Sequence, residues 1–291
     1  GEPERALRAY RRVYDEFPMS EQAAAAEEAI AALRPPPGVP ADRVQAELAR
    51  AERLFASRQW MEARAGFAPL LAMVTGDDRE LVTLRVAECD QYLRRNSAAL
   101  DALAPLLEKA TREAEARYFH LTATRALGPR DRYVALARGL VTDHPDSPWA
   151  EKTLDDLASH YITIDDDEKA DDVFREMVRR FPRGQYAERA AWKIGWRAYK
   201  QDRFVEVAST FEAAAVASPR ANYRPSWLYW AARSRDRLGN RPAATTLYRV
   251  VASDYLNSYY GRLASKLLAE RGEAIVPPIV VIAPVGTAPE V

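Results

Sequence analysis

The sequence predicts an all-α fold made of repeated helical hairpins. Three observations support this: helix-ending motifs recur at a fixed spacing, an aromatic residue precedes most of them at a fixed offset, and the polar–apolar alternation typical of strands is almost absent. A chain of 291 residues with 48% hydrophobic residues can bury a sizeable core. We therefore expect a solenoid of hairpins that forms a curved or ring-shaped superhelix.

The helix-ending motifs are the strongest repeat signal. They lie 37 residues apart, at Pro145, Pro182, Pro219 and Leu256. Eight residues before these sites stand Ala137, Phe174, Phe211 and Tyr248, and twelve before stand Tyr133, Ala170, Val207 and Ala244. Residues four apart share one helical face, and proline disfavours helical geometry just before itself. Each segment is therefore predicted to be the second helix of a hairpin, and Ala6, Tyr10 and Pro18 keep the same offsets near the N-terminus.

Small residues mark the start of the following helices. They stand five residues after four of the helix ends, at Ala23, Ala150, Ala187 and Gly261. A glycine inside a helix costs about 0.5–1 kcal/mol relative to alanine, so Gly261 is expected at a place where neighbouring chain excludes bulk. The unit that ends at Pro219 departs from the pattern, because Arg224 occupies this offset after a longer connection.

The chain divides into four parts on this reading, with roughly fourteen helices of about 10–18 residues. We expect a partial N-terminal repeat over 1–34, divergent helical hairpins over 41–130, regular repeats over 131–272 and a Pro-rich tail over 273–291. The segment 34–40, RPPPGVP, cannot be helical throughout. Both ends look truncated, so we expect the natural chain to start earlier and the extended tail to be a linker to a missing domain.

Composition excludes several classes of function. Lys and Arg number 42 and Asp and Glu number 42, so no global basic field favours a nucleic-acid partner. The single cysteine, Cys89, excludes a disulfide framework and is expected in the core. No apolar run is long enough to span a membrane, and no export signal is present.

The sequence contains no recognisable catalytic, metal or cofactor site. The three histidines, His120, His144 and His160, are scattered, and His144 takes the place that Phe181 holds in a sister repeat. The acidic run 165–172 lacks the glycine and the ligand spacing of a calcium loop, so we interpret it as a helix cap. We predict no catalytic residue, no metal and no cofactor in this chain.

Aromatic residues gather in one stretch. Trp192, Trp196 and Tyr199 fall on one helical stripe, and Trp227 and Trp230 fall on another. Two interpretations stay open: these rings belong to the repeat core, or some of them line a groove and bind a ligand such as a sugar ring or a peptide. We take these five residues as candidates for binding a ligand or partner.

Residues 190–219 resemble a tetratricopeptide repeat. Ile194 and Gly195 match the Leu-Gly pair of that family, and Tyr199 and Phe204 match its aromatics in the first helix and the turn. Phe211 and Pro219 match the second helix and its stop. The resemblance is strong over 146–270 and weak over 41–130, and the spacing of 37 exceeds the usual value of about 34.

Residues 227–264 are similar to the last superhelical repeat of soluble lytic murein transglycosylases. The resemblance rests on Trp-x-Ala-Arg at 230–233, Leu-Gly-Asn at 238–240 and a final phrase formed by Tyr259, Tyr260, Gly261, Leu263 and Ala264. It implies a periplasmic α-superhelix followed by a separate lysozyme-like domain that cleaves peptidoglycan glycan strands without hydrolysis. The catalytic phrases of that domain are absent here, so no catalytic residue is carried over.

Two hypotheses for the function follow. In the first, the chain is the non-catalytic domain of a periplasmic lytic transglycosylase and positions peptidoglycan glycan strands or partners. In the second, it is a tetratricopeptide scaffold that binds proteins during cell-envelope assembly. A third reading, an unrecognised enzyme that uses Asp165 to Asp167 or a histidine, lacks a convergent site.

Overall fold

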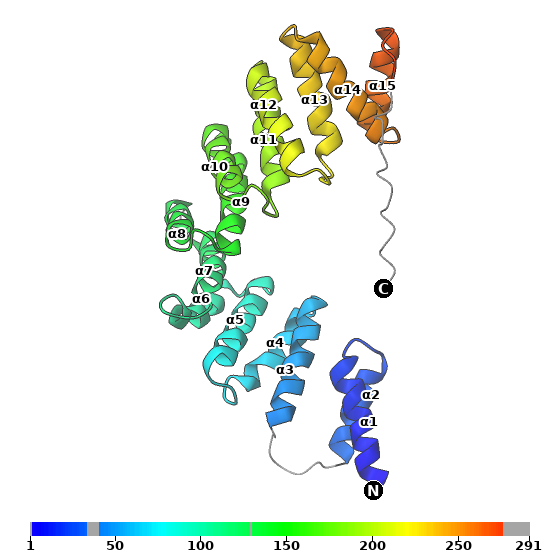
Figure 1. Ribbon diagram of the computed structural model, residues 1–291. Coiled ribbons are helices and arrows are strands. Elements are labelled where there is room, and N and C mark those ends of the chain that lie inside the picture. The colour runs from blue at the N-terminus through cyan, green and yellow to red at the C-terminus, as the bar shows by residue number, and fades with distance from the viewer. Residues whose placement is uncertain (1, 34–40, 129, 276–291) are drawn as a thin grey trace, which may run out of the picture. The chain divides into compact units, whose positions relative to one another are not determined.

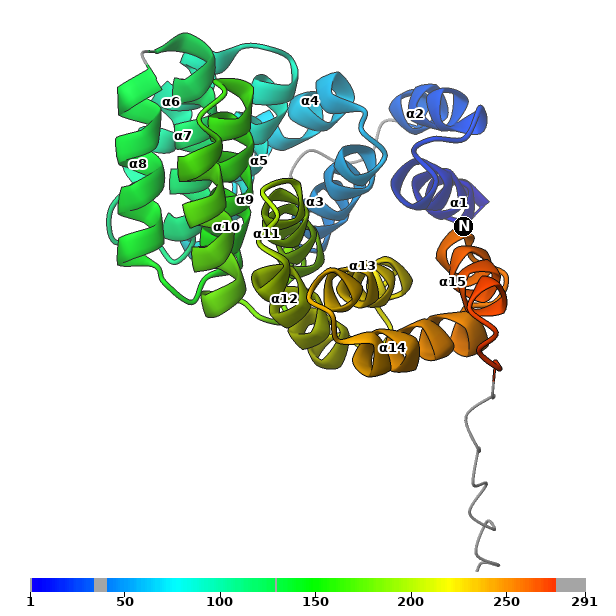
Figure 2. The same ribbon diagram turned by 90° about the horizontal axis from the view of Figure 1, so that it is seen from above.

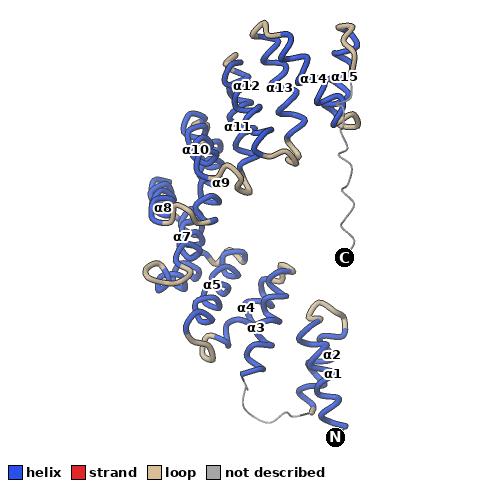
Figure 3. Tube along the Cα trace, viewed as in Figure 1, coloured by secondary structure: helices blue, strands red, loops and turns tan. Residues whose placement is uncertain are grey.

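The computed structural model describes residues 2–33, 41–128 and 130–275 of the chain. All regular structure in these ranges is helical, which confirms the predicted fold class (Figures 1 and 3). The chain forms two compact units, residues 1–153 and 154–291. The expected boundary between repeat types at residue 130 stays a prediction, and the predicted conformations of 34–40 and of 276–291 lie outside the described residues.

The helices of the first unit are α1 Glu2–Glu16, α2 Gln22–Ala32, α3 Ala41–Ala56, α4 Trp60–Leu70, α5 Gly76–Tyr92, α6 Asn96–Leu103, the 3-10 helix η1 Ala104–Leu106, α7 Glu113–Leu127 and α8 Arg130–Asp143. Helix α9, Pro148–Thr163, begins in the first unit and ends in the second. The second unit continues with α10 Asp167–Arg180, α11 Ala187–Lys200, α12 Phe204–Ala217, α13 Arg224–Arg237, α14 Arg241–Asp254 and α15 Tyr259–Glu270.

The spacing of 37 is confirmed in the positions of the helices. Helices α10, α12 and α14 begin at 167, 204 and 241, and each ends two residues before its predicted mark. Helices α11 and α13 begin at 187 and 224 and end at 200 and 237. Each hairpin of the second unit is therefore a copy of the one before it, shifted by the same number of residues.

A repeated turn joins the two helices of each hairpin. Its central residue has positive φ in all three hairpins of the second unit: 59° at Asp165, 56° at Asp202 and 77° at Gly239. The next backbone N–H donates to a carbonyl five residues back, 2.9 Å from Arg203 N to Ala198 O and 2.9 Å from Asn240 N to Arg235 O. This is the Schellman motif, which ends a helix and reverses the chain within a few residues. Short, identical turns keep the two helices of each hairpin in the same register.

Aromatic residues of the second helices lie deep in the core of the second unit. Phe174, Phe211 and Tyr248, the residues predicted from the fixed offset, are at most 2% exposed. The ring of Phe211 lies directly on Gly195 of the first helix, where an added Cβ would come within 2.3 Å of two ring carbons. Close approach of the two helices therefore depends on a small residue beneath each aromatic ring. Figure 2 shows α11 to α14 as successive packed helices.

The structure confirms the prediction that a larger side chain is excluded at Gly261. A Cβ at this position would lie 1.8 Å from the backbone oxygen of Tyr255, in the turn before α15. The Ser258 hydroxyl caps the same helix by accepting from the backbone N–H of Gly261 at 2.9 Å. Ala150 and Ala187, at the equivalent position of earlier repeats, are buried as well.

Arg224 departs from this pattern because its side chain bridges other groups. Its Nε donates to the Ala215 carbonyl at 3.1 Å, and its Nη1 donates to the Tyr255 hydroxyl at 2.6 Å. The guanidinium thus joins the end of α12 to the turn before α15. The long side chain of Arg224 thus connects α12, α13 and the turn before α15, whereas the other repeats have a small residue at this offset.

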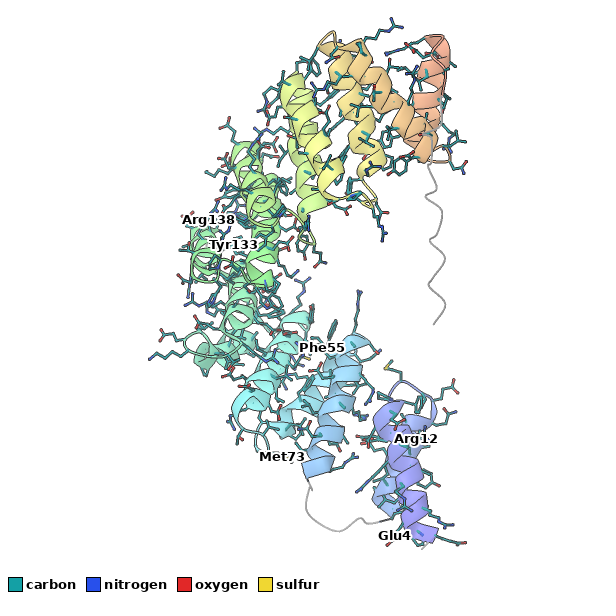
Figure 4. The ribbon with its side chains drawn as sticks, viewed as in Figure 1. Glu4, Arg12, Phe55, Met73, Tyr133 and Arg138 are labelled. Carbon is teal, nitrogen blue, oxygen red and sulfur yellow. The ribbon has the colours of Figure 1, made fainter. Side chains whose placement is uncertain are left out.

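The first unit also packs aromatic rings against small residues, but the lengths of its helices are less regular. Phe67 of α4 and Ala51 of α3 are 0% and 1% exposed. Phe55 on α3, labelled in Figure 4, contacts the Phe67 ring edge-on at 6.4 Å. Cys89 is fully buried in this core, as predicted, and burial raises the pKa of its thiol to about 12. The short helix α6 gives way to η1 at Pro105, so the spacing of the second unit is lost here.

Replacing Gly261 by alanine is expected to lower the free energy of unfolding by about 1–3 kcal/mol, because the methyl group conflicts with rigid backbone. Urea denaturation followed by circular dichroism measures the change. Gly139→Ala on α8 is the matched control, since a Cβ there meets nothing within 4 Å and should stabilise the protein by about 0.5–1 kcal/mol. Equal effects of the two substitutions would contradict the packing argument.

Candidate functional site

Three aromatic rings form a stack along α11. The rings of Trp192 and Trp196 are nearly parallel, at 9°, with centroids 5.6 Å apart, and Trp196 and Tyr199 follow at 7° and 5.7 Å. Spacings of four and three residues place these side chains on one face of the helix. All three are partly exposed. The stripe predicted from the sequence is therefore a continuous set of rings at the surface of the second unit.

Trp230 of α13 completes this surface. Its ring meets Trp196 edge-on at 5.0 Å and Tyr199 at 4.6 Å, and it is also partly exposed. We call Trp192, Trp196, Tyr199 and Trp230 the aromatic band. Within the described residues, the buried indole Nε1 of Trp230 has no hydrogen-bond partner. The band therefore joins the first helices of two successive hairpins.

Trp227 lies elsewhere. It is 1% exposed and packs in the core between α11, α12 and α13, with its ring stacked on Tyr223 at 5.9 Å. It forms part of the wall of a largely apolar cavity of about 420 Å³ among α10, α11 and α12. Trp227 and Trp230 thus separate into a core residue and a surface residue, although both belong to the stripe that the sequence suggested.

A second hollow lies beside Trp192. This cavity, of about 410 Å³, is lined by Trp192, Asn222, Tyr223, Ser226 and Tyr260. It combines three aromatic rings, two of which are phenols, with one side-chain amide and the hydroxyl of Ser226. Our sequence analysis did not single out Asn222 or Ser226. The connection after Pro219, which carries Asn222, spans residues 218–223 and has the same length as the connection at 181–186, so the longer connection predicted from the sequence is wrong.

A half-buried arginine lies behind the band. The guanidinium of Arg233 interacts with the hydroxyls of Tyr199, Tyr229 and Tyr248, and these tyrosines raise its pKa against the opposing effect of burial. Burial likewise raises the pKa of Tyr229, and Arg233 opposes that shift. The arginine therefore ties the phenol groups of the two hairpins together and keeps positive charge close to the aromatic band.

The motif at 259–264, on which the family resemblance rests, mainly packs α15 against the second unit. Gly261 and Ala264 are buried, and Leu263 is partly buried against the core of the second unit. Tyr260 contacts Tyr229 at 5.4 Å and lines the cavity beside Trp192. Tyr259 is 64% exposed.

The first unit contains a buried charge cluster of its own. The guanidinium of Arg85 on α5 lies 2.9 Å from carboxylate oxygens of both Glu52 and Glu88, and 3.6 Å from Glu115. Glu88 is only 2% exposed, and burial raises its pKa to about 8. One arginine therefore faces three acids on three successive first helices, and Glu88 retains its proton near neutral pH.

The acidic run at 165–172 and His144 make contacts that hold helix ends in place. Asp166 caps α10 by accepting from the backbone N–H of Lys169, as expected for the acidic run. His144 Nε2 lies 3.3 Å from a Glu113 carboxylate oxygen, so this histidine joins α7 to the turn after α8. Within the part of the chain that the structure describes, no group of three or more potential ligands could hold a metal ion, and no helix is long and apolar enough to cross a membrane.

These features define a tetratricopeptide-like array of helical hairpins with an aromatic surface. The sequence matches no protein-family model and no curated protein. Similar solved structures include MamA of AMB-1, with 16% identity over 65% of this chain and 98% of that one at a TM-score of 0.41. NprR from B. thuringiensis has 12% identity, coverage of 93% and 82% and a TM-score of 0.44. The TPR2AB domain of yeast Sti1, solved in a pHSP90 complex, has 14% identity, coverage of 80% and 99% and a TM-score of 0.35. Every TM-score is below 0.5, so the class rests on the packing described above.

The raised pKa of Glu88 predicts a dependence of stability on pH. Its ordinary pKa is 4.5 and its folded value is about 8, so its contribution to stability is fully present below about pH 4.5 and is lost as the pH rises through about 8. Glu88→Gln is expected to flatten this decline, measured by urea denaturation between pH 4.5 and 8. Glu270→Gln, at a side chain that is 63% exposed, is the control and should leave the profile unchanged.

Proposed function

We propose that this chain is a non-enzymatic interaction module and that the aromatic band binds an extended segment of a partner protein. The supporting observation is the band itself: four large rings on two neighbouring hairpins stay partly exposed although the core of the same unit buries Trp227, Phe211 and Tyr248 completely. Tryptophan, tyrosine and arginine are the residues that most often dominate binding energy at protein interfaces. Arg233 hydrogen-bonds to Tyr199 and so adds a cation next to one ring of the band.

The arrangement of the rings favours a polypeptide over a sugar on this surface. Trp192 is stacked between parallel neighbours, Trp196 at 5.6 Å and Phe211 at 5.7 Å. Trp192 is partly buried and in contact with both rings, which restricts access to its faces, and a ring face is the part of an aromatic side chain that a sugar ring stacks upon. Ring edges and stems of such a stack still offer apolar contact area to a peptide. The band is therefore proposed to bind side chains of an extended segment of a partner protein.

Site-specific photocrosslinking tests this proposal. A photoreactive phenylalanine analogue that replaces Tyr199 is expected to crosslink one partner protein in cells of the natural host, and Trp230→Ala should reduce the product at least about tenfold because it removes a central anchor. The same analogue at Val205, which is 68% exposed on α12, is the control and should give none of this product. Equal crosslinking from both positions would contradict a role for the band.

A second candidate comes from the cavity beside Trp192. Its three rings, one amide and three hydroxyls are suited to a sugar, which presents both apolar faces and hydroxyl groups. Together with the resemblance of 227–264 to lytic transglycosylases, this supports a proposal that the chain is the superhelical domain of a periplasmic enzyme of that type. In this proposal it positions peptidoglycan glycan strands for a lysozyme-like domain C-terminal to this chain.

Cosedimentation with purified peptidoglycan sacculi separates the two candidates. If the cavity holds glycan, Asn222→Ala combined with Tyr260→Ala should weaken binding about tenfold or more, because the hydrogen-bonding amide and one stacking ring are lost. Val216→Ala, at a side chain that is 81% exposed on α12, should bind as the unaltered protein does. Absence of binding by the unaltered protein would exclude the glycan candidate. It would not affect the proposal that the aromatic band binds a partner protein.

A further inference from the structure

The apolar cavity among α10, α11 and α12 has a filled counterpart one repeat further along the chain. Three residues of its wall lie 37 positions before residues that bond to one another there: Val178, Ala187 and Ser218. In that counterpart, the Arg224 guanidinium donates to the Ala215 carbonyl at 3.1 Å and to the Tyr255 hydroxyl at 2.6 Å. The cavity therefore lies where the next repeat holds an arginine side chain.

Shorter side chains leave this space open. The wall residues that α12 contributes include Thr210, Ala213 and Ala214. The residues at the same positions of α14 are larger and pack in or against the core: Leu247, Val250 and Val251. The difference leaves about 420 Å³ for an occupant with an apolar surface, a size common among ligand sites.

A backbone acceptor in the wall has no donor. Val178 lies four residues before Pro182, which has no N–H to complete the helical hydrogen bond. The N–H of Phe181 donates to the Met177 carbonyl at 2.8 Å, and within the described residues no donor bonds the Val178 carbonyl. A free carbonyl at the end of a helix carries partial negative charge, so its favoured partner is a cationic donor.

The next repeat shows which group satisfies such a carbonyl. Ala215 has the same place before Pro219, and its carbonyl accepts a hydrogen bond from Arg224. Ala187 stands at the position of Arg224 and has no side-chain donor. The cavity therefore lacks the guanidinium that the chain itself supplies in the next repeat.

One acid in the wall is also without a partner. Glu188 of α11 is partly buried and forms no ion pair in the part of the chain that the structure describes. Two arginines share the wall with it. Arg175 is already bonded to Asp171 at 3.0 Å and to Glu206. Arg179 is exposed to solvent. A cation that enters the cavity can therefore pair with a carboxylate as well as with a carbonyl.

We propose that this cavity binds an arginine side chain of a partner protein. Its guanidinium donates to the Val178 carbonyl and pairs with Glu188, in the way that Arg224 bonds the Ala215 carbonyl within the chain. Its aliphatic stem packs against the apolar wall. The site shares no residue with the aromatic band, so it does not depend on the function proposed for the band.

A titration with N-acetylargininamide, followed by amide and indole NMR signals, tests the site. The probe is expected to shift the backbone signals of Glu188 and Ser218 and the indole signal of Trp227, which all line the cavity. N-acetylcitrullinamide has nearly the same shape without the charge and should bind at least about tenfold more weakly. Equal binding of the two probes, or no shift at these residues, would overturn the proposal.

Ala187→Arg copies the next repeat and blocks the cavity from within. It should abolish binding of the arginine probe and raise the Tm, because the new guanidinium bonds the Val178 carbonyl. Val216→Arg, which adds the same charge at a side chain that is 81% exposed, is the control and should bind the probe unchanged. Glu188→Gln tests the site independently of that substitution and should weaken binding about fivefold or more. Unchanged binding by Glu188→Gln or by a folded Ala187→Arg variant would contradict the proposal.

Free L-arginine identifies the kind of occupant. A site for a side chain of a partner protein accepts the probe with its amino and carboxyl groups blocked, so the free amino acid should bind no more tightly than N-acetylargininamide. Tighter binding of free arginine would show a small-molecule site and would overturn a partner side chain as the occupant.

Discussion

The contact between an aromatic ring of each second helix and a small residue of the first helix is the interaction on which the array depends. Phe211 over Gly195 shows the constraint most clearly, because even one added carbon would meet the ring at 2.3 Å. Close helix packing at this point fixes the angle and register of the hairpin. Schellman turns at Asp165, Asp202 and Gly239 then reproduce the same geometry 37 residues further along.

The surface chemistry follows from this constraint. Once Phe211 and Tyr248 fill the interior from the second helices, aromatic residues on the outer stripe of the first helices find no space in the core. Trp192, Trp196 and Tyr199 therefore stack on one another at the surface, and Trp196 and Tyr199 meet the ring of Trp230 edge-on. The buried ring of Trp227 shows that a position one turn away on the same helix is enough to reverse this outcome.

Partly buried arginines connect successive hairpins in both units. In the second unit, Arg233 and Arg224 bond to tyrosine hydroxyls and backbone carbonyls and connect successive hairpins. In the first unit, Arg85 lies among Glu52, Glu88 and Glu115, and the most deeply buried of these acids stays protonated near neutral pH. Burial raises the pKa of Glu88, so the stability of the first unit is expected to depend on pH.

The sequence by itself determined the helical class, the spacing of 37, the helix ends and the buried positions of Phe174, Phe211 and Tyr248, because these depend on local signals that recur at fixed offsets. It also located the small residue at Gly261, although only the structure showed that the backbone of Tyr255 requires it. Only the tertiary structure separated Trp227 from Trp230, placed Asn222 and Ser226 beside Trp192, and gathered three acids around Arg85. Periodicity fixes which face of a helix a residue occupies, whereas the packing of neighbouring hairpins decides whether that face is covered.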